Sequence, residues 1–199
     1  MDRRTVILTG LAAAGSATAA PAWSQASPDY ETREDRAPTY TRDEIIREGS
    51  NFMGVAAEAI GGAIERIARD YGDEPTAYIA GEEGSGAVAV GLRYGQGLLH
   101  MKNFSEPQEV HWRGPSVGWD VGGNASRVFT LVYNLDRPDM LFRRYPGVEG
   151  SAYMVGGLGV NYQKAEGITL APIRAGVGLR LGANVGYLAY SRKRRLLPF

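Results

Sequence analysis

The feature that most constrains this chain is an alternation of bulky and small residues that runs from about residue 76 to residue 190. Its clearest stretch is AGVGLRLGANVGY at 175–187, where the bulky apolar side chains fall on odd positions and all four glycines fall on even positions. The same division recurs at 87–94 and 117–122. Successive side chains of a β-strand point to opposite faces of the sheet, so a period of two predicts strands.

The alternating segments are short and are separated by turns that contain glycine, which makes up 27 of the 199 residues against a usual share of about 7%. Such spacing is typical of an antiparallel barrel or sandwich. We expect a mainly β fold, specifically a small antiparallel β-barrel of about eight to ten strands. The bulky face predicts a core layer. The glycine face allows a packed helix, a sharply curved neighbouring strand or a ligand to approach the backbone closely.

One amphipathic helix is predicted before the strands, over 41–71. Thr41 and Glu44 have the spacing of a capping box, and Gly72 is a typical residue after a helix end. Apolar residues between them recur at intervals of three and four, as on the buried face of a helix. Several glycines weaken the helix, and we expect a break near 49–51.

The first 26 residues have the order of an export signal. Arg3 and Arg4 precede a short apolar run that ends in small residues, and the run is too short to span a membrane as a helix. The arginine pair resembles a twin-arginine signal, and an ordinary secretory signal is the alternative. Residues 27–40 are charged and contain two prolines, which predicts a mobile linker. The expected organisation is therefore signal (1–26), linker (27–40) and domain (41–199), with the mature protein in the periplasm.

Composition excludes several classes of function. The chain has no cysteine, which rules out disulfides, thiolate metal sites and a cysteine nucleophile. Its 22 basic and 22 acidic residues balance, whereas a dedicated nucleic-acid-binding domain is strongly basic. We expect no nucleic-acid partner.

Two short motifs match enzyme patterns by chance. Residues 114–118 fit the G-x-S-x-G nucleophile elbow around Ser116, but that elbow needs a helix next and a later histidine. His100 and His111, the only histidines, precede the serine, and the following residues alternate like a strand. Residues 84–89 fit a dinucleotide fingerprint but also lead into an alternating segment rather than a helix.

The remaining titratable groups do not form a recognisable catalytic or metal site. His100 and His111 have no third ligand at a fixed spacing, so we predict no metal site. Glu82 and Glu83 are interpreted as solvated carboxylates in a turn. We therefore expect a protein that is not an enzyme and uses no cofactor.

Charged residues on the glycine-rich faces are the candidates for ligand binding. Arg93, Arg174 and Arg180 are isolated arginines that could line a lumen or cleft for an anionic ligand. Asp120 lies on a small-residue face as well, and Arg127 or Arg180 could neutralise it.

A basic run near the C-terminus is the candidate for membrane contact. Arg192, Lys193, Arg194 and Arg195 precede the apolar residues 196–199. Each such charge adds about 1 kcal/mol of attraction near an anionic lipid surface. The alternative is a solvated terminus, or a last strand whose edge is protected by charge.

The segment GPSVGWDVGG at 114–123, followed by RVFTLVYN at 127–134, resembles the core of the SYLF (Ysc84-like) lipid-binding domain. A short helix expected at 136–142 and the glycine-rich strand at 176–181 follow the same order. From residue 40 to 199, and in its export signal, the chain more closely resembles the EipA (envelope integrity protein A) family of periplasmic proteins.

This resemblance implies a small soluble barrel with a packed helix, no catalysis and a role in maintaining the cell envelope. The likeness to SYLF domains implies an anionic lipid or glycolipid as ligand. The alternative is a scaffold that binds an envelope protein through a sheet edge or through the arm at 27–40.

Overall fold

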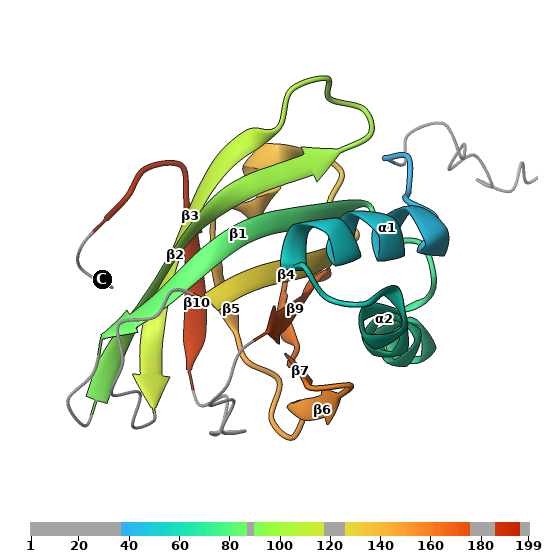
Figure 1. Ribbon diagram of the computed structural model, residues 1–199. Helices are drawn as coiled ribbons and strands as arrows, with labels where there is room; N and C mark the ends of the chain where they lie inside the picture. Colours follow the sequence, from blue (N-terminus) through green and yellow to red (C-terminus); the bar gives the residue numbers. More distant parts are fainter. Residues whose placement is uncertain (1–36, 87–89, 118–125, 176–185, 196–199) are drawn as a thin grey trace, which may run out of the picture. The chain divides into compact units, whose positions relative to one another are not determined.

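In the computed structural model, the described residues (37–86, 90–117, 126–175 and 186–195) form two α-helices, a short 3₁₀ helix and a ten-stranded antiparallel sheet (Figure 1). In chain order the elements are α1 (Arg42–Met53), α2 (Ala57–Tyr71), β1 (Ala77–Gly86), β2 (Val90–Met101), β3 (Gln108–Val117), β4 (Ser126–Tyr133), η1 (Pro138–Leu141), β5 (Arg144–Pro146), β6 (Tyr153–Val155), β7 (Leu158–Val160), β8 (Gln163–Ala165), β9 (Ile168–Ala175) and β10 (Tyr187–Ser191).

The sheet curls so that β5, at one end of the strand order, meets β8, which pairs with β9. Its strand order is β5-β10-β3-β2-β1-β4-β9-β7-β6, and β8 also pairs with β9. An isolated antiparallel bridge joins Gly147, just after β5, to Gln163 in β8. Next to it, the backbone N–H of Val148 donates a 2.9 Å hydrogen bond to the carbonyl of Tyr162. The prediction of a small antiparallel β-barrel is confirmed.

Alternate side chains of the strands fill the inside of the barrel, as the period of two predicts. On β1, the residues Ala77 and Ile79 are buried inward, and their cross-strand partners Met101 and Leu99 lie on the same face. These residues belong to one apolar cluster that also takes in Val110, Trp112, Val128, Val132, Leu135, Leu141, Tyr145, Ile168, Leu170, Leu188 and Tyr190.

The two helices cover the outer face of β1, β4, β9 and β7. Phe129 and Leu131 of β4 and Ile173 of β9 point outward into a second apolar cluster. From the helices, Ile45 and Ile60 enter the same cluster and are fully buried. Both faces of β4 and β9 are therefore buried along most of their length, which accounts for the many apolar residues in the two strands.

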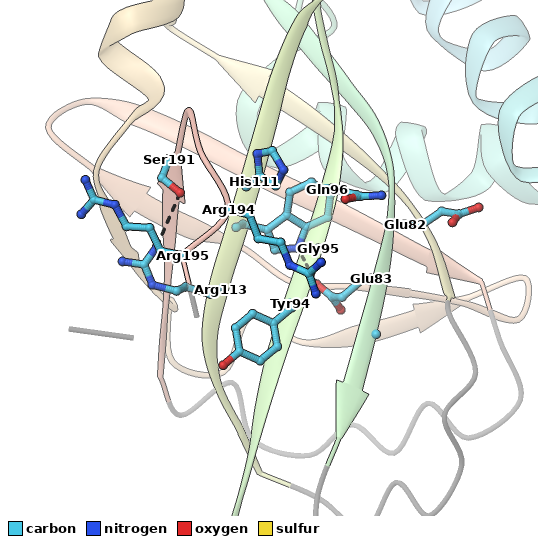
Figure 2. Close-up of a pocket in the computed structure, with 12 residues that line it drawn as sticks. Glu82, Glu83, Tyr94, Gly95, Gln96, His111, Arg113, Ser191, Arg194 and Arg195 are labelled. Atoms are coloured by element: carbon cyan, nitrogen blue, oxygen red, sulfur yellow. Dashed lines mark hydrogen bonds between the residues drawn. The ribbon is translucent and has the colours of Figure 1, made fainter. Parts of the chain in front are cut away.

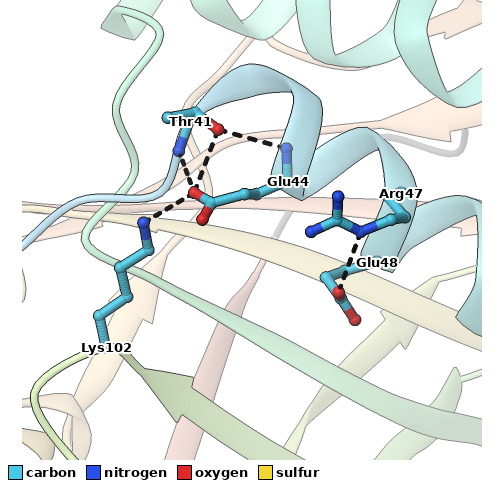
Figure 3. A network of polar contacts seen from close by, with 5 residues as sticks. All are labelled: Thr41, Glu44, Arg47, Glu48 and Lys102. Carbon is cyan, nitrogen blue, oxygen red and sulfur yellow. Dashed lines mark hydrogen bonds and ion pairs between the residues drawn. The ribbon is translucent and has the colours of Figure 1, made fainter.

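The capping box predicted at the start of the helical segment is confirmed (Figure 3). The backbone N–H of Glu44 donates to the Thr41 hydroxyl at 3.3 Å, and the Glu44 carboxylate accepts from the backbone N–H of Thr41 at 2.7 Å. Lys102, at the turn after β2, donates a 2.7 Å hydrogen bond to the same carboxylate. The cap therefore also ties α1 to the end of β2.

The helical segment expected over 41–71 is divided into two helices, and the break lies at Gly54 rather than at 49–51. Gly54 has a φ of +66°, a left-handed conformation that ends α1 and favours glycine. Gly49 instead lies inside α1 and is buried. A Cβ there would be 3.0 Å from the Ile60 side chain and 3.1 Å from the Phe129 ring. Gly49 thus serves close packing of α1, and does not interrupt it.

In the part of the chain that the structure describes, no helix is both long enough and apolar enough to cross a membrane.

Candidate functional site

A charged cluster lies inside the barrel around Glu83 of β1. Its carboxylate is only 6% exposed. Arg174 of β9 donates from Nε to Oε1 at 3.0 Å, and Nε of Arg93 on β2 lies 3.2 Å from the same oxygen. Trp112 of β3 donates from its indole Nε1 to Oε2 at 2.9 Å. Arg174 also donates to the side-chain oxygen of Asn161. The cluster thus joins four strands across the barrel.

Glu83 is ionised because its partners outweigh its burial. Loss of solvent by itself raises the pKa of the Glu83 carboxyl group. The charges of Arg174 and Arg93, together with the hydrogen bonds from Arg174 and Trp112, act in the opposite direction and hold the pKa below its ordinary value. The carboxylate in turn lies against both guanidinium groups and balances one of their two positive charges.

The glycines of β1 and β2 make room for the Trp112 ring. A Cβ built on Gly95 would lie 2.0 Å from Cε2 of Trp112, and one on Gly81 would lie 2.7 Å from Cη2. Both distances are shorter than any real contact. At these positions, the close approach that glycine permits is made by an indole ring inside the barrel.

The interpretation of Glu82 and Glu83 as solvated turn carboxylates is wrong about the turn, because both residues lie within β1. Glu82 is exposed, as expected, whereas Glu83 is buried. The alternation of the strand contained the signal, since Glu83 has the same parity as the buried Ala77 and Ile79.

The structure brings together two of the four residues predicted to line a lumen or cleft. Arg93 and Arg174 both reach Glu83. Asp120 and Arg180 lie outside the described residues. Contact of Arg93 or Arg174 with a ligand stays a prediction.

A cavity of about 550 Å³ lies at one end of the barrel, and we call it the end cavity. Leu99 and Met101, the last inward residues of β2, belong to its wall. The turn between β2 and β3 contributes Phe104 and Pro107, and Arg192 comes from the segment after β10. The remaining lining residues are Glu106, Gln108, Arg137, Pro138 and Asp139.

A second depression, of about 290 Å³, lies over β1, β2 and β3, and we call it the outer groove (Figure 2). Its polar lining comes mainly from His111 and Arg113 of β3 and from Arg194 and Arg195. Glu82 of β1 lies on the side of the groove opposite to Arg113. Arg113 is only 6% exposed although it lies in this surface depression.

The basic run predicted to contact a membrane is divided between these two hollows. Arg192 lines the end cavity and packs over the Phe142 ring at 4.6 Å. Arg194 and Arg195 line the outer groove. All four residues of the run, Lys193 included, are exposed. Their contact with a membrane stays a prediction.

The histidines are engaged with neighbouring side chains. His100 stacks on Tyr78 with the ring centroids 4.6 Å apart, and burial lowers the pKa of its imidazole. Nε2 of His111 lies 3.6 Å from Oε1 of Glu109. Among the described residues, no group of three or more histidine or acidic side chains is arranged to hold a metal ion. Ser116 lies within β3.

The fold and the buried cluster define a class of protein. It is a small antiparallel barrel that has two helices packed on its outer face and a charged cluster inside. A family model described as envelope integrity protein A matches residues 38–199, and the chain therefore belongs to the EipA family.

A solved structure supports the same assignment. It is a crystal structure described as a beta-barrel-like, uncharacterized protein from Brucella abortus. The two chains are 47% identical, and the match covers 82% of this chain and 100% of the other with a TM-score of 0.73. A comparison with curated proteins finds no match.

Proposed function

We propose that this protein supports the integrity of the cell envelope by binding an anionic lipid or glycolipid in the end cavity. Membership of the envelope integrity protein A family supports the general role. The observation that carries the ligand class is the end cavity itself, an apolar hollow with arginine at its rim.

The cavity has the size and lining of a site for an amphiphile. Its volume of about 550 Å³ falls within the range of about 300–1,000 Å³ that is typical of ligand pockets. Leu99 and Met101 offer an apolar wall for an acyl chain. Phe104, which also lines the cavity, is 46% exposed and adds apolar surface at its rim.

Arg192 is the best candidate to bind the charged head. At the rim, Arg137 already lies 3.5 Å from the carboxylate of Asp139. Arg192 has no such carboxylate partner among the described residues, and its guanidinium packs over Phe142. A guanidinium presents a planar fork that matches phosphate or carboxylate oxygens. We therefore assign the acyl chain to the wall of β2 and the anionic head to Arg192.

Binding is tested by native mass spectrometry with lysophosphatidylglycerol and lysophosphatidylcholine that carry the same acyl chain. We expect one molecule of the anionic lipid to be retained, and Arg192→Gln to weaken its binding several-fold. The matched control Arg47→Gln, which removes an exposed charge from α1, should leave binding unchanged. Failure of the folded protein to retain either lipid contradicts the proposal.

The proposed location is the periplasm. Residues 1–26 would direct export of the chain and would then be cleaved. Residues 27–40 would form a linker, and residues 41–199 would form the working domain. The protein is proposed to act by binding rather than by catalysis. Cell fractionation and N-terminal sequencing of the mature protein test this: a mature chain that retains its first residues in the cytoplasm contradicts it.

A scaffold function is the second candidate, and the edge strand β6 is the observation that favours it. β6 ends the strand order of the described sheet, and its Met154 is 42% exposed. A partner strand could add to such an edge. Met154→Lys, and deletion of 27–36, which spares the buried Ala37 and the Tyr40 ring packed on Tyr78, should then abolish association with a defined envelope protein while lipid uptake survives.

A further inference from the structure

Arg113 is a buried cation without a counter-ion among the described residues. It is only 6% exposed, and its Nε has no hydrogen-bond partner in the described part of the chain. Within the same residues its side chain forms one long hydrogen bond, from Nη1 to the Ser191 hydroxyl at 3.5 Å. No carboxylate of the described residues lies within ion-pair distance of it, in contrast to the equally buried Arg174, which binds Glu83.

Such an arrangement is costly unless an anion completes it. A guanidinium group does not lose its proton in proteins, so it cannot become neutral when it is buried. Burial of a charge without a partner is strongly destabilising. An anion bound to the guanidinium group would offset that destabilisation. The position of Arg113 on the outer face of β3 makes this anion accessible from solvent, because the outer groove opens over it.

Two further guanidinium groups and one imidazole lie at the same groove. Arg194 and Arg195 follow β10 and extend over the outer face of β3 (Figure 2). His111 lies two residues before Arg113 on the same face, and its Nδ1 is also buried without a partner. The groove therefore presents three guanidinium groups, together with an imidazole whose Nε2 lies 3.6 Å from the carboxylate of Glu109.

The acidic groups of the groove do not cancel this charge. Glu83 borders the groove but is bound by Arg174 and Trp112. Glu82 lies on β1, two strands from Arg113 on β3, which corresponds to about 10 Å at the usual strand spacing.

We propose that the outer groove binds a phosphate-class oxyanion, with Arg113 at its base and Arg194 and Arg195 on its open side. Arginine forks bind such groups by parallel, charge-assisted hydrogen bonds. The Ser191 hydroxyl accepts from Nη1 of Arg113 and donates to the carbonyl of Lys193, so it ties the base of the groove to the segment after β10. The anion is either free or the head group of a lipid. This site is distinct from the end cavity and does not depend on it.

Isothermal titration of the full mature chain with inorganic phosphate tests the proposal. We expect saturable binding at low ionic strength, at least tenfold weaker binding in Arg113→Gln, and an intermediate loss in Arg113→Lys, which keeps the charge but not the fork. Arg69→Gln, which removes an exposed charge from α2, is the matched control and should bind as the wild type does.

A double variant, Arg194→Gln with Arg195→Gln, covers the case in which Arg113→Gln does not fold. Both residues are exposed, so the fold should be retained and phosphate binding should fall at least several-fold. Absence of phosphate binding by the wild type, or equal affinity in the double variant, overturns the proposal.

Vesicles distinguish the two sources of the anion. Binding to phosphatidylglycerol vesicles but not to phosphatidylcholine vesicles, with release by inorganic phosphate, identifies a lipid head group. Binding of phosphate without binding to either vesicle identifies a free anion. Uptake of lysolipid by the end cavity should be unchanged in Arg113→Gln, so the two proposals fail separately.

Discussion

The indole Nε1 of Trp112 donates a 2.9 Å hydrogen bond to Oε2 of Glu83 inside the barrel. The ring reaches this carboxylate by lying directly over Gly95, which has no side chain to exclude it. One arrangement therefore joins the glycine-rich strand, the aromatic residue and the buried charge. Substitution of the glycine or of the charged residue should disturb it.

Gly95→Ala should destabilise the protein by about 1–3 kcal/mol, because overpacking of a core forces side chains and backbone to move. The added methyl group would lie 2.0 Å from the ring of Trp112. Gly84→Ala on β1 is the control, since a Cβ there meets nothing within 4 Å. Urea denaturation measures both, and equal stability of the two variants would show that the ring does not need the glycine.

Glu83→Gln should destabilise the protein by about 3–5 kcal/mol, because removal of one partner leaves the other charges buried and uncompensated. Arg174 is the charge most affected, since both Nε and Nη2 donate to this carboxylate. Glu82→Gln, on the exposed face of the same strand, should change stability by less than about 0.5 kcal/mol. A small effect of Glu83→Gln would contradict the role assigned to the cluster.

Stability should fall on acidification, and Glu83 should cause part of the fall. The pKa of Glu83 in the folded protein lies below the ordinary value of 4.5. A carboxyl group of this kind stabilises the fold above its unfolded-state pKa, and that contribution is lost as the pH falls from there through the folded-state pKa. Unfolding measured between pH 7 and pH 3 should show a smaller loss in Glu83→Gln. An identical loss in both proteins contradicts the prediction.

The capping box of α1 is predicted to give Glu44 an unusually acidic carboxyl group. The hydrogen bond from Lys102, followed by that from the backbone of Thr41, lowers the pKa of Glu44 to about 2. Carboxyl-detected NMR titration measures this value. Lys102→Gln should raise the pKa toward its ordinary value, whereas Arg47→Gln, one turn further along α1, should not.

Thr41→Ala tests the cap itself. Loss of the threonine hydroxyl should cost about 1 kcal/mol of stability, the usual effect of replacing a capping residue by alanine. Ser105→Ala, which removes an exposed hydroxyl from the turn between β2 and β3 and no helix cap, is the comparison. Thermal unfolding that does not distinguish the two variants would contradict the cap's contribution.

The barrel and the helix start could be predicted from sequence because both follow from local rules. Alternation assigns side chains to two faces, and the spacing of Thr41 and Glu44 defines a cap. Placement of the helix break was less predictable. Gly49 and Gly54 look alike in sequence, but only the packing of Ile60 and Phe129 shows that Gly49 is inside a helix.

The charged cluster could not be found in this way. Glu83 and Arg174 are 91 residues apart in the chain, and their meeting depends on strand pairing that one sequence does not specify. Arg113 illustrates the same limit. Its position on an alternating strand predicts the outer face, but the pattern does not show that the side chain is buried there.

The most direct test of the proposed function is NMR of protein labelled at the methionine methyl groups and titrated with dodecyl phosphate, a simple anionic amphiphile. We predict saturable intermolecular NOEs between the alkyl chain and Met101, which lines the end cavity, and weaker binding in Arg192→Gln. Met154, exposed on β6, should show none. An alkyl chain that never contacts Met101, or contacts both methionines alike, would contradict the binding of an amphiphile in the end cavity.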